Sequence, residues 1–266
     1  MSKVSQRPKQ YAQGWTEFYK LRFKVTPDVL IPRPETELLV DEILERVKNS
    51  EFRVQNEKQS TLDTLHSALT ILDLGTGSGN IAISLAKNLL HIGGATIIAA
   101  DISAKALEVA KQNAKLHGVE DQITFLQSNL LSCVYLPGGQ CVHLPDIIVT
   151  NLPYIPSARI PYLDSSVKDF EPHMALDGGE DGFELYRKLF QQINLLSTPG
   201  MNLNVHTGCV YWKPQLVICE IDYTHGELAV TEAQKFFPEA KVEIKTDLAH
   251  KQRILLIWQL LQNGSY

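Results

Sequence analysis

The chain has 266 residues, of which 44% are apolar, and its formal net charge is −5. This length suits one large domain, or one domain with an appendage, around a sizeable core. The acidic balance argues against a general nucleic-acid binder, because such proteins usually carry a basic surface. No membrane-spanning helix is expected either, since the chain has no run of about 18 apolar residues.

The absence of a signal sequence and of metal-ligand spacing predicts the compartment and the metal content. Residues 1–15 carry charges but no apolar stretch typical of a secretory signal. The eight histidines show no H-x-x-x-H pattern, and we expect no metal. We expect a monomer without membrane contacts, in the cytoplasm or, in a eukaryote, in an organellar matrix. Free thiols in a reducing compartment fit the four cysteines, which lack metal-ligand spacing: Cys133, Cys141, Cys209 and Cys219.

The first predicted elements lie before residue 69. Residues 15–25 alternate large apolar and polar side chains, which predicts a strand or a hairpin. Residues 26–47 contain two proline-bounded turns followed by an amphipathic helix. Pro34 suits the first turn of this helix, and the acidic residues after it complement the helix dipole. Residues 48–68 are polar and poor in core-forming residues, so we expect a helix tail and a loop there.

From residue 69 onward, predicted strands and helices alternate. Such alternation indicates an α/β fold whose mainly parallel sheet is covered on both faces. The predicted helices are 80–90, 103–117 and one near 181–196. Ser103 and Gly118 are the predicted caps of the second of these helices. The predicted strands are 69–75, 95–101, 122–128, 146–151, 216–221, 242–246 and 253–258.

Three of these strand ends suit a ligand, and ligands of such sheets bind outside the carboxyl ends of the strands. The glycines of residues 75–79 let the backbone turn tightly and approach a ligand closely, although their G-x-G-x-G spacing is not the dinucleotide fingerprint. Asp101 can accept hydrogen bonds from both hydroxyls of a ribose. Taken singly, these residues could form an ordinary turn and a helix N-cap; together they predict a nucleoside site.

The third strand end is Asn151-Leu152-Pro153-Tyr154. In one interpretation, Asn and Pro simply end the strand, as they do in many proteins. In the other, an amide and an aromatic ring hold a substrate at the crevice that the glycine loop also faces.

Several segments resemble known methyltransferases. "DLGTGSGNIAISLA" with "AADIS" is similar to motifs of class I S-adenosylmethionine-dependent methyltransferases, and "NLPY" is similar to the (Asn/Asp/Ser)-Pro-Pro-(Tyr/Phe) motif of enzymes that methylate planar nitrogens. More narrowly, the release factor glutamine methyltransferases, or HemK/PrmC family, resemble this chain over roughly residues 10–258. The segments that carry this narrower resemblance are "TEFYKLRFKVTPDVLIPRPETELLV", "FEPHMALDGGEDGFELYRKL" and "TDLAHKQRILLI".

The resemblance implies the fold and the cofactor. The fold would be a three-layer sandwich with a Rossmann-like, mainly parallel, seven-stranded methyltransferase sheet, preceded by a short β-hairpin. Residues 1–48 would form the hairpin and a linker helix, the remnant of a connection to a missing helical domain, and residues 49–266 the methyltransferase domain. S-adenosylmethionine would be bound by Gly75, Thr76, Gly77, Ser78, Gly79, Asp101, Asn129, Leu130 and Asn151.

The resemblance also implies the substrate, the glutamine in the Gly-Gly-Gln loop of a peptide chain release factor. Its amide nitrogen is a poor nucleophile because the lone pair is delocalised into the carbonyl. Asn151 could offer its side-chain oxygen to one N–H, the Leu152 carbonyl could accept the other, and the Tyr154 ring could pack on the flat amide. The predicted catalytic group, acting by positioning and electrostatics, is Asn151, Leu152, Pro153 and Tyr154.

The chain departs from the family pattern at several positions. Leu152 stands where the family has proline, which adds an N–H and frees φ, although Pro153 still favours an extended Leu152. Asn129 stands where relatives often have an acid. We predict a loop insertion at 200–215, and Asp222 stands where glycine is expected.

Two other functions stay open, and Arg33, Glu171 and Pro172 each have two interpretations. An adenine-amino methyltransferase acting on DNA or RNA would share both motifs, although duplex binding draws on more Lys and Arg. An inactive nucleoside-binding relative is suggested by Leu152 and by the missing helical domain. Arg33 could lie near the cofactor or the substrate, or form a salt bridge at the surface or at the helix start. Glu171 with Pro172 could shape the wall of the substrate cleft or contact the substrate.

Overall fold

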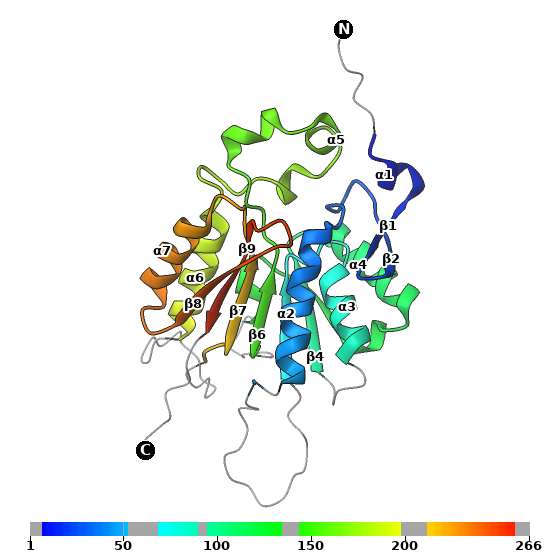
Figure 1. Ribbon diagram of the computed structural model, residues 1–266. Helices are drawn as coiled ribbons and strands as arrows, with labels where there is room; N and C mark the ends of the chain where they lie inside the picture. The colour runs from blue at the N-terminus through cyan, green and yellow to red at the C-terminus, as the bar shows by residue number, and fades with distance from the viewer. Residues whose placement is uncertain are drawn as a thin grey trace, which may run out of the picture.

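The computed structural model describes residues 7–49, 51–52, 69–89, 95–134, 144–197 and 212–258. At its centre is a seven-stranded sheet with the order β5-β4-β3-β6-β7-β9-β8 (Figure 1). Strands β3 to β7 are parallel, and β9 runs antiparallel to β7 and β8. This confirms the predicted sheet, whose strands are β3 (Leu69–Leu74), β4 (Ala95–Asp101), β5 (Ile123–Gln127), β6 (Ile147–Thr150), β7 (Leu216–Glu220), β8 (Lys241–Thr246) and β9 (Gln252–Trp258).

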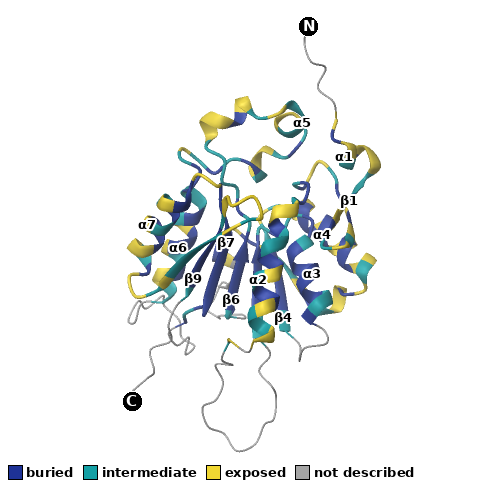
Figure 2. Ribbon diagram, viewed as in Figure 1, coloured by how far each residue is buried: buried dark blue, intermediate teal, exposed yellow. Residues whose placement is uncertain are grey.

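Helices cover both faces of this sheet, and the strands lie buried between them (Figures 1 and 2). Ile71 and Ile147 pack with α2 and α3, whereas the next residues, Leu72 and Ile148, pack with α6 and α7. Because side chains alternate across a strand, each strand supplies both cores, which explains the continuous apolar runs. The layers are formed by α2 (Glu37–Lys48), α3 (Asn80–Leu89), α4 (Ala104–His117), α6 (Glu184–Leu196) and α7 (Gly226–Phe236).

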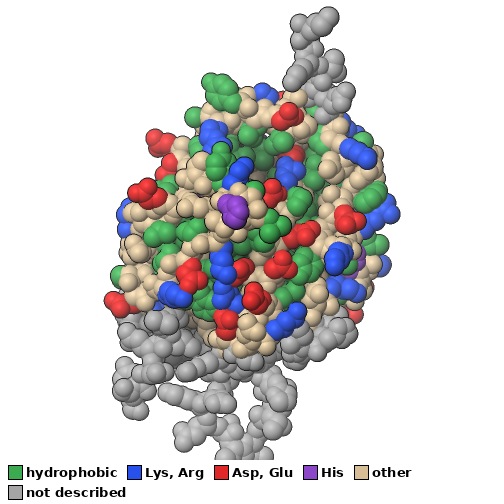
Figure 3. All heavy atoms as spheres, in the orientation of Figure 1, with side chains coloured by type: hydrophobic (Ala, Val, Ile, Leu, Met, Phe, Trp, Pro, Cys, Tyr) green, Lys and Arg blue, Asp and Glu red, His purple; other side chains and the backbone are tan. Residues whose placement is uncertain are grey.

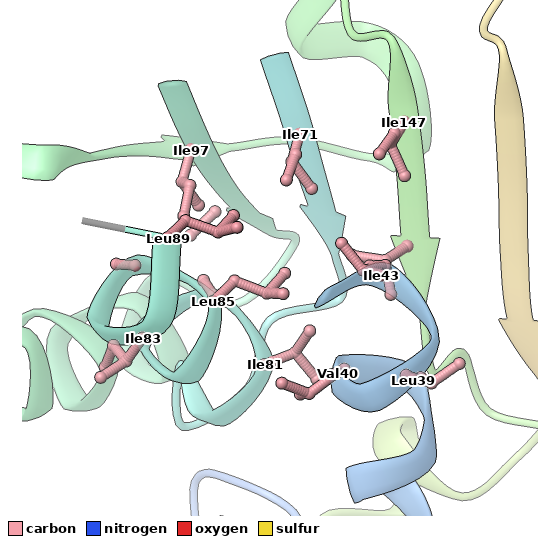
Figure 4. Close-up of a cluster of buried hydrophobic side chains, with 14 of the residues drawn as sticks. Leu39, Val40, Ile43, Ile71, Ile81, Ile83, Leu85, Leu89, Ile97 and Ile147 are labelled. Atoms are coloured by element: carbon pink, nitrogen blue, oxygen red, sulfur yellow. The ribbon is translucent and has the colours of Figure 1, made fainter. Parts of the chain in front are cut away.

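Figure 4 shows how α2 joins the sheet. Val40 of α2 lies beside Ile81 of α3, and Ile43 of α2 lies next to the strand residues Ile71 and Ile147; all five are buried. Burying one such side chain stabilises a fold by about 1.5–3 kcal/mol. The helix assigned to residues 1–48 therefore shares a core with the sheet, and the division at residue 48 stays a prediction.

The predicted hairpin is confirmed. Strands β1 (Trp15–Phe18) and β2 (Leu21–Lys24) pair antiparallel in a sheet of their own. Tyr19 and Lys20 between them have φ of 50° and 60°, as the two central residues of a type I′ turn require. Phe18 and Phe23 are buried and pack edge to face, which anchors the hairpin.

Several elements were not predicted from the sequence. They include α7 and several short helices, of which η4, α5 and η5 follow β6 along the chain and lie above the sheet in Figure 1. The bounds of the short helices are α1 (Lys9–Gln13), η1 (Pro34–Thr36), η2 (Glu120–Gln122), η3 (Leu130–Val134), η4 (Ser157–Tyr162), α5 (Ser165–Lys168) and η5 (His173–Ala175). Most of the predicted loop at 48–68 and of the predicted insertion at 200–215 lies outside the described residues.

Other sequence predictions concern caps, cysteines, metals and membranes. The caps of α4 are confirmed: Ser103 Oγ accepts from Ala106 N, and Gly118 is left-handed with φ of 64°. Cys219 is a buried free thiol. Over the described ranges, no cluster of His, Cys, Asp and Glu could hold a metal ion, and no helix is long and apolar enough to cross a bilayer.

Candidate active site

A cavity of about 330 Å³ lies at the carboxyl edge of the sheet. The loops that follow β3, β4, β5 and β6 line it, and residues from 27–36 and 172–175 contribute further wall. In the sheet, β4 and β5 lie on one side of β3, and β6 and β7 lie on the other. This edge is therefore a topological switch point, where open α/β sheets bind their ligands.

The loop between β3 and α3 forms one wall of the cavity. The backbone N–H groups of Gly75 and Thr76 both donate to the carbonyl of Ala100, at 2.8 and 2.9 Å, and this ties the loop to β4. Gly75 and Gly77 have φ of 76° and 54°, a region that side chains disfavour. The backbone thus needs glycine at both positions, and Gly75, Thr76, Gly77 and Ser78 all line the cavity.

Gly79 has a different surrounding, because it is not among the residues that line this cavity. A Cβ at Gly79 would lie 2.8 Å from Ile83 Cδ1 and 3.1 Å from Ala110 Cβ. Glycine here therefore allows α3 and α4 to approach closely. The contact of Gly79 with a cofactor stays a prediction.

Asp101 closes β4 and lines the cavity. Its Oδ2 accepts from Gly77 N at 2.9 Å and its Oδ1 accepts from Ser103 N at 2.8 Å, so it braces the glycine loop while Ser103 caps α4. Burial raises the pKa of Asp101, and its backbone N–H donors oppose that rise. Each carboxylate oxygen keeps further lone-pair capacity, so Asp101 can also accept from two neighbouring hydroxyls.

The loop after β5 brings Asn129 and Leu130 to the cavity. Leu130 has φ of 51°, and Ser128 Oγ donates to its carbonyl at 2.6 Å, which holds this unusual turn. The side chains of Leu130 and Ile102 offer apolar surface beside Asp101. Backbone approach, a hydroxyl-binding carboxylate and apolar walls together fit a nucleoside.

Asp73 lies buried beneath the glycine loop. Its Oδ2 accepts from the Thr76 hydroxyl at 2.6 Å and from Ala82 N at 3.0 Å. Its Oδ1 is buried and has no hydrogen-bond partner in the described part of the chain. Burial raises the pKa of Asp73 to about 7, and both donors oppose this rise.

The side chain of Asn151 is held by its amide nitrogen. Nδ2 donates to Thr36 Oγ1 at 3.1 Å and to Glu220 Oε2 at 3.0 Å. The Glu220 carboxylate also accepts from the Tyr154 and Thr36 hydroxyls, so Nδ2 and not Oδ1 faces it. Asn151 lines the cavity, and no described residue donates to its Oδ1. That oxygen is therefore available as an acceptor.

Glu220 connects Asn151 to Tyr154 and to the N-terminal segment. It ends β7 with only 1% of its surface exposed. Its Oε1 accepts from the Tyr154 hydroxyl at 3.0 Å, and its carboxylate also accepts from the Thr36 hydroxyl. Burial raises the pKa of Glu220; the Thr36 and Tyr154 hydroxyls and the charge of Arg253 act in the opposite direction.

The other three residues of the predicted catalytic group have distinct surroundings. Leu152 and Pro153 line the cavity, whereas Tyr154 is not among the residues that line it. The Leu152 carbonyl accepts from the Tyr186 hydroxyl at 3.3 Å, and the Leu152 side chain is buried. Tyr154 packs against the core between the sheet and α6, with its hydroxyl on Glu220.

A salt bridge joins two segments of the cavity wall. Arg33 Nη2 and Glu171 Oε1 form this pair, and Glu171 Oε2 also accepts from Ile31 N at 3.4 Å. Arg33 and Pro172 line the cavity, while Glu171 lies behind them with its side chain 1% exposed. Arg33 thus lines the cavity and also forms a salt bridge, so these two predicted roles are compatible.

Asp222 has a local role in the structure. Its Oδ1 accepts from Thr224 N and from the Thr224 hydroxyl, at 2.9 and 2.6 Å, and its Oδ2 accepts from Arg159 at 3.1 Å. It therefore closes the turn before α7 and links that turn to η4. Glycine could make neither set of contacts.

Sequence reasoning did not single out Thr36, Glu220 or Tyr186. Glu220 nevertheless carries the signal that identified Asp101, since both are acids that close an apolar strand. Thr36 and Tyr186 carry no such signal, because their hydroxyls reach the site only through helix packing.

Comparisons with known proteins support a methyltransferase. A family model described as "Methyltransferase domain" matches residues 65–138. The release factor glutamine methyltransferase of Bacillus cereus is 37% identical over 93% of this chain and 75% of its own length. That of Lactococcus lactis subsp. lactis is 35% identical over 97% of this chain and 81% of its own length.

Solved structures show the same fold at low identity. The hMettl16 catalytic domain in complex with the MAT2A 3'UTR hairpin 6 has a TM-score of 0.61 at 13% identity, covering 93% of this chain and 78% of that one. The N-terminal domain of human METTL16 in complex with SAH has a TM-score of 0.56 at 13% identity, covering 90% and 76%. These structures share the fold, whereas the curated relatives share sequence over nearly the whole chain; the protein therefore belongs to the family of release factor glutamine methyltransferases.

Proposed function

We propose that this protein transfers a methyl group from S-adenosylmethionine to the side-chain amide nitrogen of the glutamine in the Gly-Gly-Gln loop of a peptide chain release factor. The observation that carries the proposal is the convergence of three strand ends on one cavity. The glycine loop after β3, Asp101 at the end of β4 and Asn151 after β6 all line it. Membership of the release factor glutamine methyltransferase family supports the choice of substrate.

The cofactor would be held by residues whose chemistry suits its parts. Gly75 to Ser78, Asp101, Ile102 and Leu130 all line the cavity. The glycine loop would present its backbone to the cofactor, Asp101 would accept from the ribose hydroxyls, and the two apolar side chains would pack on the base. When bound, S-adenosylmethionine supplies an electrophilic methyl group on a sulfonium. Direct contacts of Gly79 and Asn129 with it remain part of the proposal.

The substrate amide would be held by two acceptors. Asn151 Oδ1 accepts one N–H, and the Leu152 carbonyl accepts the other, because a carbonyl oxygen that takes the Tyr186 hydroxyl at 3.3 Å keeps a second lone pair. Fixing both N–H groups favours a geometry in which the nitrogen lone pair becomes available. Such pre-organised contacts, together with proximity, supply catalysis without a covalent intermediate.

The Pro153 and Tyr154 positions support this arrangement in different ways. Pro153 lines the cavity and restricts Leu152 to extended conformations, which directs the carbonyl. Tyr154 contributes through its hydroxyl on Glu220, and packing of its ring on the substrate amide is part of the proposal.

The charge distribution favours a protein substrate over a nucleic acid. The chain has a net charge of −5, and acidic and basic side chains are interspersed on the face that Figure 3 shows. Nucleic-acid binding draws its affinity from clustered Lys and Arg. We propose a monomer that meets nucleic acid only indirectly, through its release factor partner.

The test is mass spectrometry of a release factor after incubation with the protein and labelled S-adenosylmethionine. We expect one added methyl group, on the glutamine of the Gly-Gly-Gln loop. A release factor with Ala at that glutamine is the control and should gain none. An adenine-containing oligonucleotide is incubated in parallel; methylation of the adenine without methylation of the glutamine would refute the proposed substrate.

A further inference from the structure

We propose that Glu220 is a positioning residue that fixes which atom of the Asn151 side chain faces the substrate. This inference rests on the proposed function, since it concerns how the same site holds a planar N–H group. It starts from an ambiguity in asparagine itself. A rotation of the amide by half a turn exchanges an acceptor oxygen for a donor nitrogen, and only the oxygen can hold an N–H.

The hydrogen bonds around Asn151 remove this ambiguity. Nδ2 donates at 3.0 Å to Glu220 Oε2, and both Glu220 oxygens serve as acceptors, since the carboxylate also takes the Tyr154 and Thr36 hydroxyls. If Asn151 were flipped, its Oδ1 would face a carboxylate oxygen, and two acceptors would oppose each other. The Thr36 hydroxyl strengthens the selection, because it donates to Glu220 and accepts from Asn151 Nδ2 at 3.1 Å.

Glu220 acts through other residues, since it does not line the cavity. Its second oxygen accepts from the Tyr154 hydroxyl at 3.0 Å, and the Tyr186 hydroxyl donates to its main-chain carbonyl and, at 3.3 Å, to that of Leu152. Glu220 is thus connected to Asn151 and Tyr154 through its carboxylate, and to Leu152 through the Tyr186 hydroxyl. Asn151 and Tyr154 donate to different oxygens of Glu220, and a glutamine in its place would have a nitrogen, which is a donor, at one of these two positions.

The structure suggests a compensating pair of substitutions. In Glu220→Gln combined with Asn151→Asp, the new glutamine nitrogen donates to one oxygen of the new aspartate, and the glutamine oxygen accepts from Tyr154. The other aspartate oxygen then faces the cavity as an acceptor. The double variant keeps the net charge of the pair. It restores an acceptor oxygen at position 151 toward the cavity, while the hydrogen bond between the two side chains now runs from position 220 to position 151.

The experiment measures three quantities for wild type, Glu220→Gln and the double variant. Single-turnover methylation of the release factor reports the transfer rate, and calorimetry reports cofactor affinity. Hydrogen exchange of the Asn151 side-chain NH₂, followed by NMR in the free protein and assigned by its loss in Asn151→Asp, reports the orientation without any reaction. Glu232→Gln is the matched control, because Glu232 is a buried acid on α7 that pairs with Arg187 and Lys235 instead.

We expect Glu220→Gln to slow transfer on the order of 10- to 100-fold, as loss of a partner that orients a functional group does. Cofactor affinity should change by less than about threefold, because Asn151 Nδ2 is directed to Glu220. The Asn151 NH₂ should exchange at least about tenfold faster, because it loses its carboxylate acceptor. The double variant should regain about tenfold of the lost rate. Glu232→Gln should match wild type in all three measurements.

Two results would overturn the inference: a wild-type transfer rate with slow NH₂ exchange in Glu220→Gln, or a double variant that transfers no faster than Glu220→Gln. A wild-type protein that leaves release factors unmodified would refute the proposed function alone. The NH₂ exchange of wild type and Glu220→Gln would then still decide whether Glu220 orients Asn151.

Discussion

The buried side-chain amide of Asn113 on α4 donates to the carbonyl of Ser78 in the glycine loop, at 2.8 Å. The same amide binds the N-terminal hairpin: its Nδ2 donates to Lys24 O at 3.0 Å, and its Oδ1 accepts from Lys24 N at 2.7 Å. One side chain therefore holds together the hairpin, a helix and the loop that forms a wall of the cavity.

Asn113→Ala should therefore affect both stability and the site. Loss of these hydrogen bonds leaves polar groups of the main chain unsatisfied, which should lower the free energy of unfolding by about 1–3 kcal/mol. Cofactor affinity should fall as well, because Ser78 lines the cavity. Urea unfolding and calorimetry measure the two effects. Asn88→Ala is the control, since among the described residues the Asn88 side chain contacts Ser84 O of its own helix and no other hydrogen-bond partner. Equal losses in both variants would contradict the bridging role.

Asp101→Ala should weaken S-adenosylmethionine binding by about 1–3 kcal/mol, the range for losing charge-assisted hydrogen bonds. The carboxylate would accept from the ribose, and it also braces Gly77 N at 2.9 Å. Asp101→Asn keeps an acceptor oxygen and should have an intermediate affinity. Calorimetry that finds an unchanged affinity in Asp101→Ala would remove Asp101 from the site. Binding of NAD in place of S-adenosylmethionine would refute the cofactor class.

Asn151→Ala should slow methyl transfer on the order of 100-fold or more, since it removes a pre-organised acceptor. Cofactor affinity should change less, because the amide oxygen is assigned to the substrate. The removal also leaves Glu220 without one of its donors, so unfolding should be measured alongside single-turnover methylation. If this variant transfers at the wild-type rate, Asn151 merely ends a strand.

Leu152→Pro restores the family's proline and tests the main departure from its pattern. No described residue accepts a hydrogen bond from Leu152 N, so the loss of this N–H should cost little. We expect a transfer rate equal to or above that of wild type, because φ is then restricted. The Leu152 side chain is buried in the core, however, and its loss should lower the free energy of unfolding by about 1–2 kcal/mol. A slower transfer at equal cofactor affinity would show that leucine is needed.

Asp73→Asn should change how stability depends on pH. The pKa of Asp73 is raised from 3.8 to about 7, so between these values the folded state holds a proton that the unfolded state lacks. This contribution to stability is complete below about pH 4 and is lost as the pH rises to about 7. The variant has no such proton, so its free energy of unfolding relative to wild type should rise across this window, by at most about 1.4 kcal/mol per pH unit. Urea unfolding at several pH values measures the difference, and a flat difference would contradict the raised pKa.

Local sequence determined the strands of the central sheet and the residues at their ends. The alternation of apolar runs with amphipathic stretches located all seven strands of the sheet, because side-chain period and backbone preferences act over a few residues. The glycine loop, Asp101 and Asn151 were found by the same local signals, and parallel strands place their carboxyl ends at one edge.

Only the tertiary structure decided what surrounds these residues. Thr36 and Glu220 meet at Asn151 although they lie 115 and 69 residues from it in the chain, since α2 packs on the sheet and β7 pairs with β6. The same packing directed the Tyr154 hydroxyl to Glu220 and placed Gly79 between two helices. Such contacts depend on which distant elements bury their apolar faces together, and no periodicity within one segment records that choice.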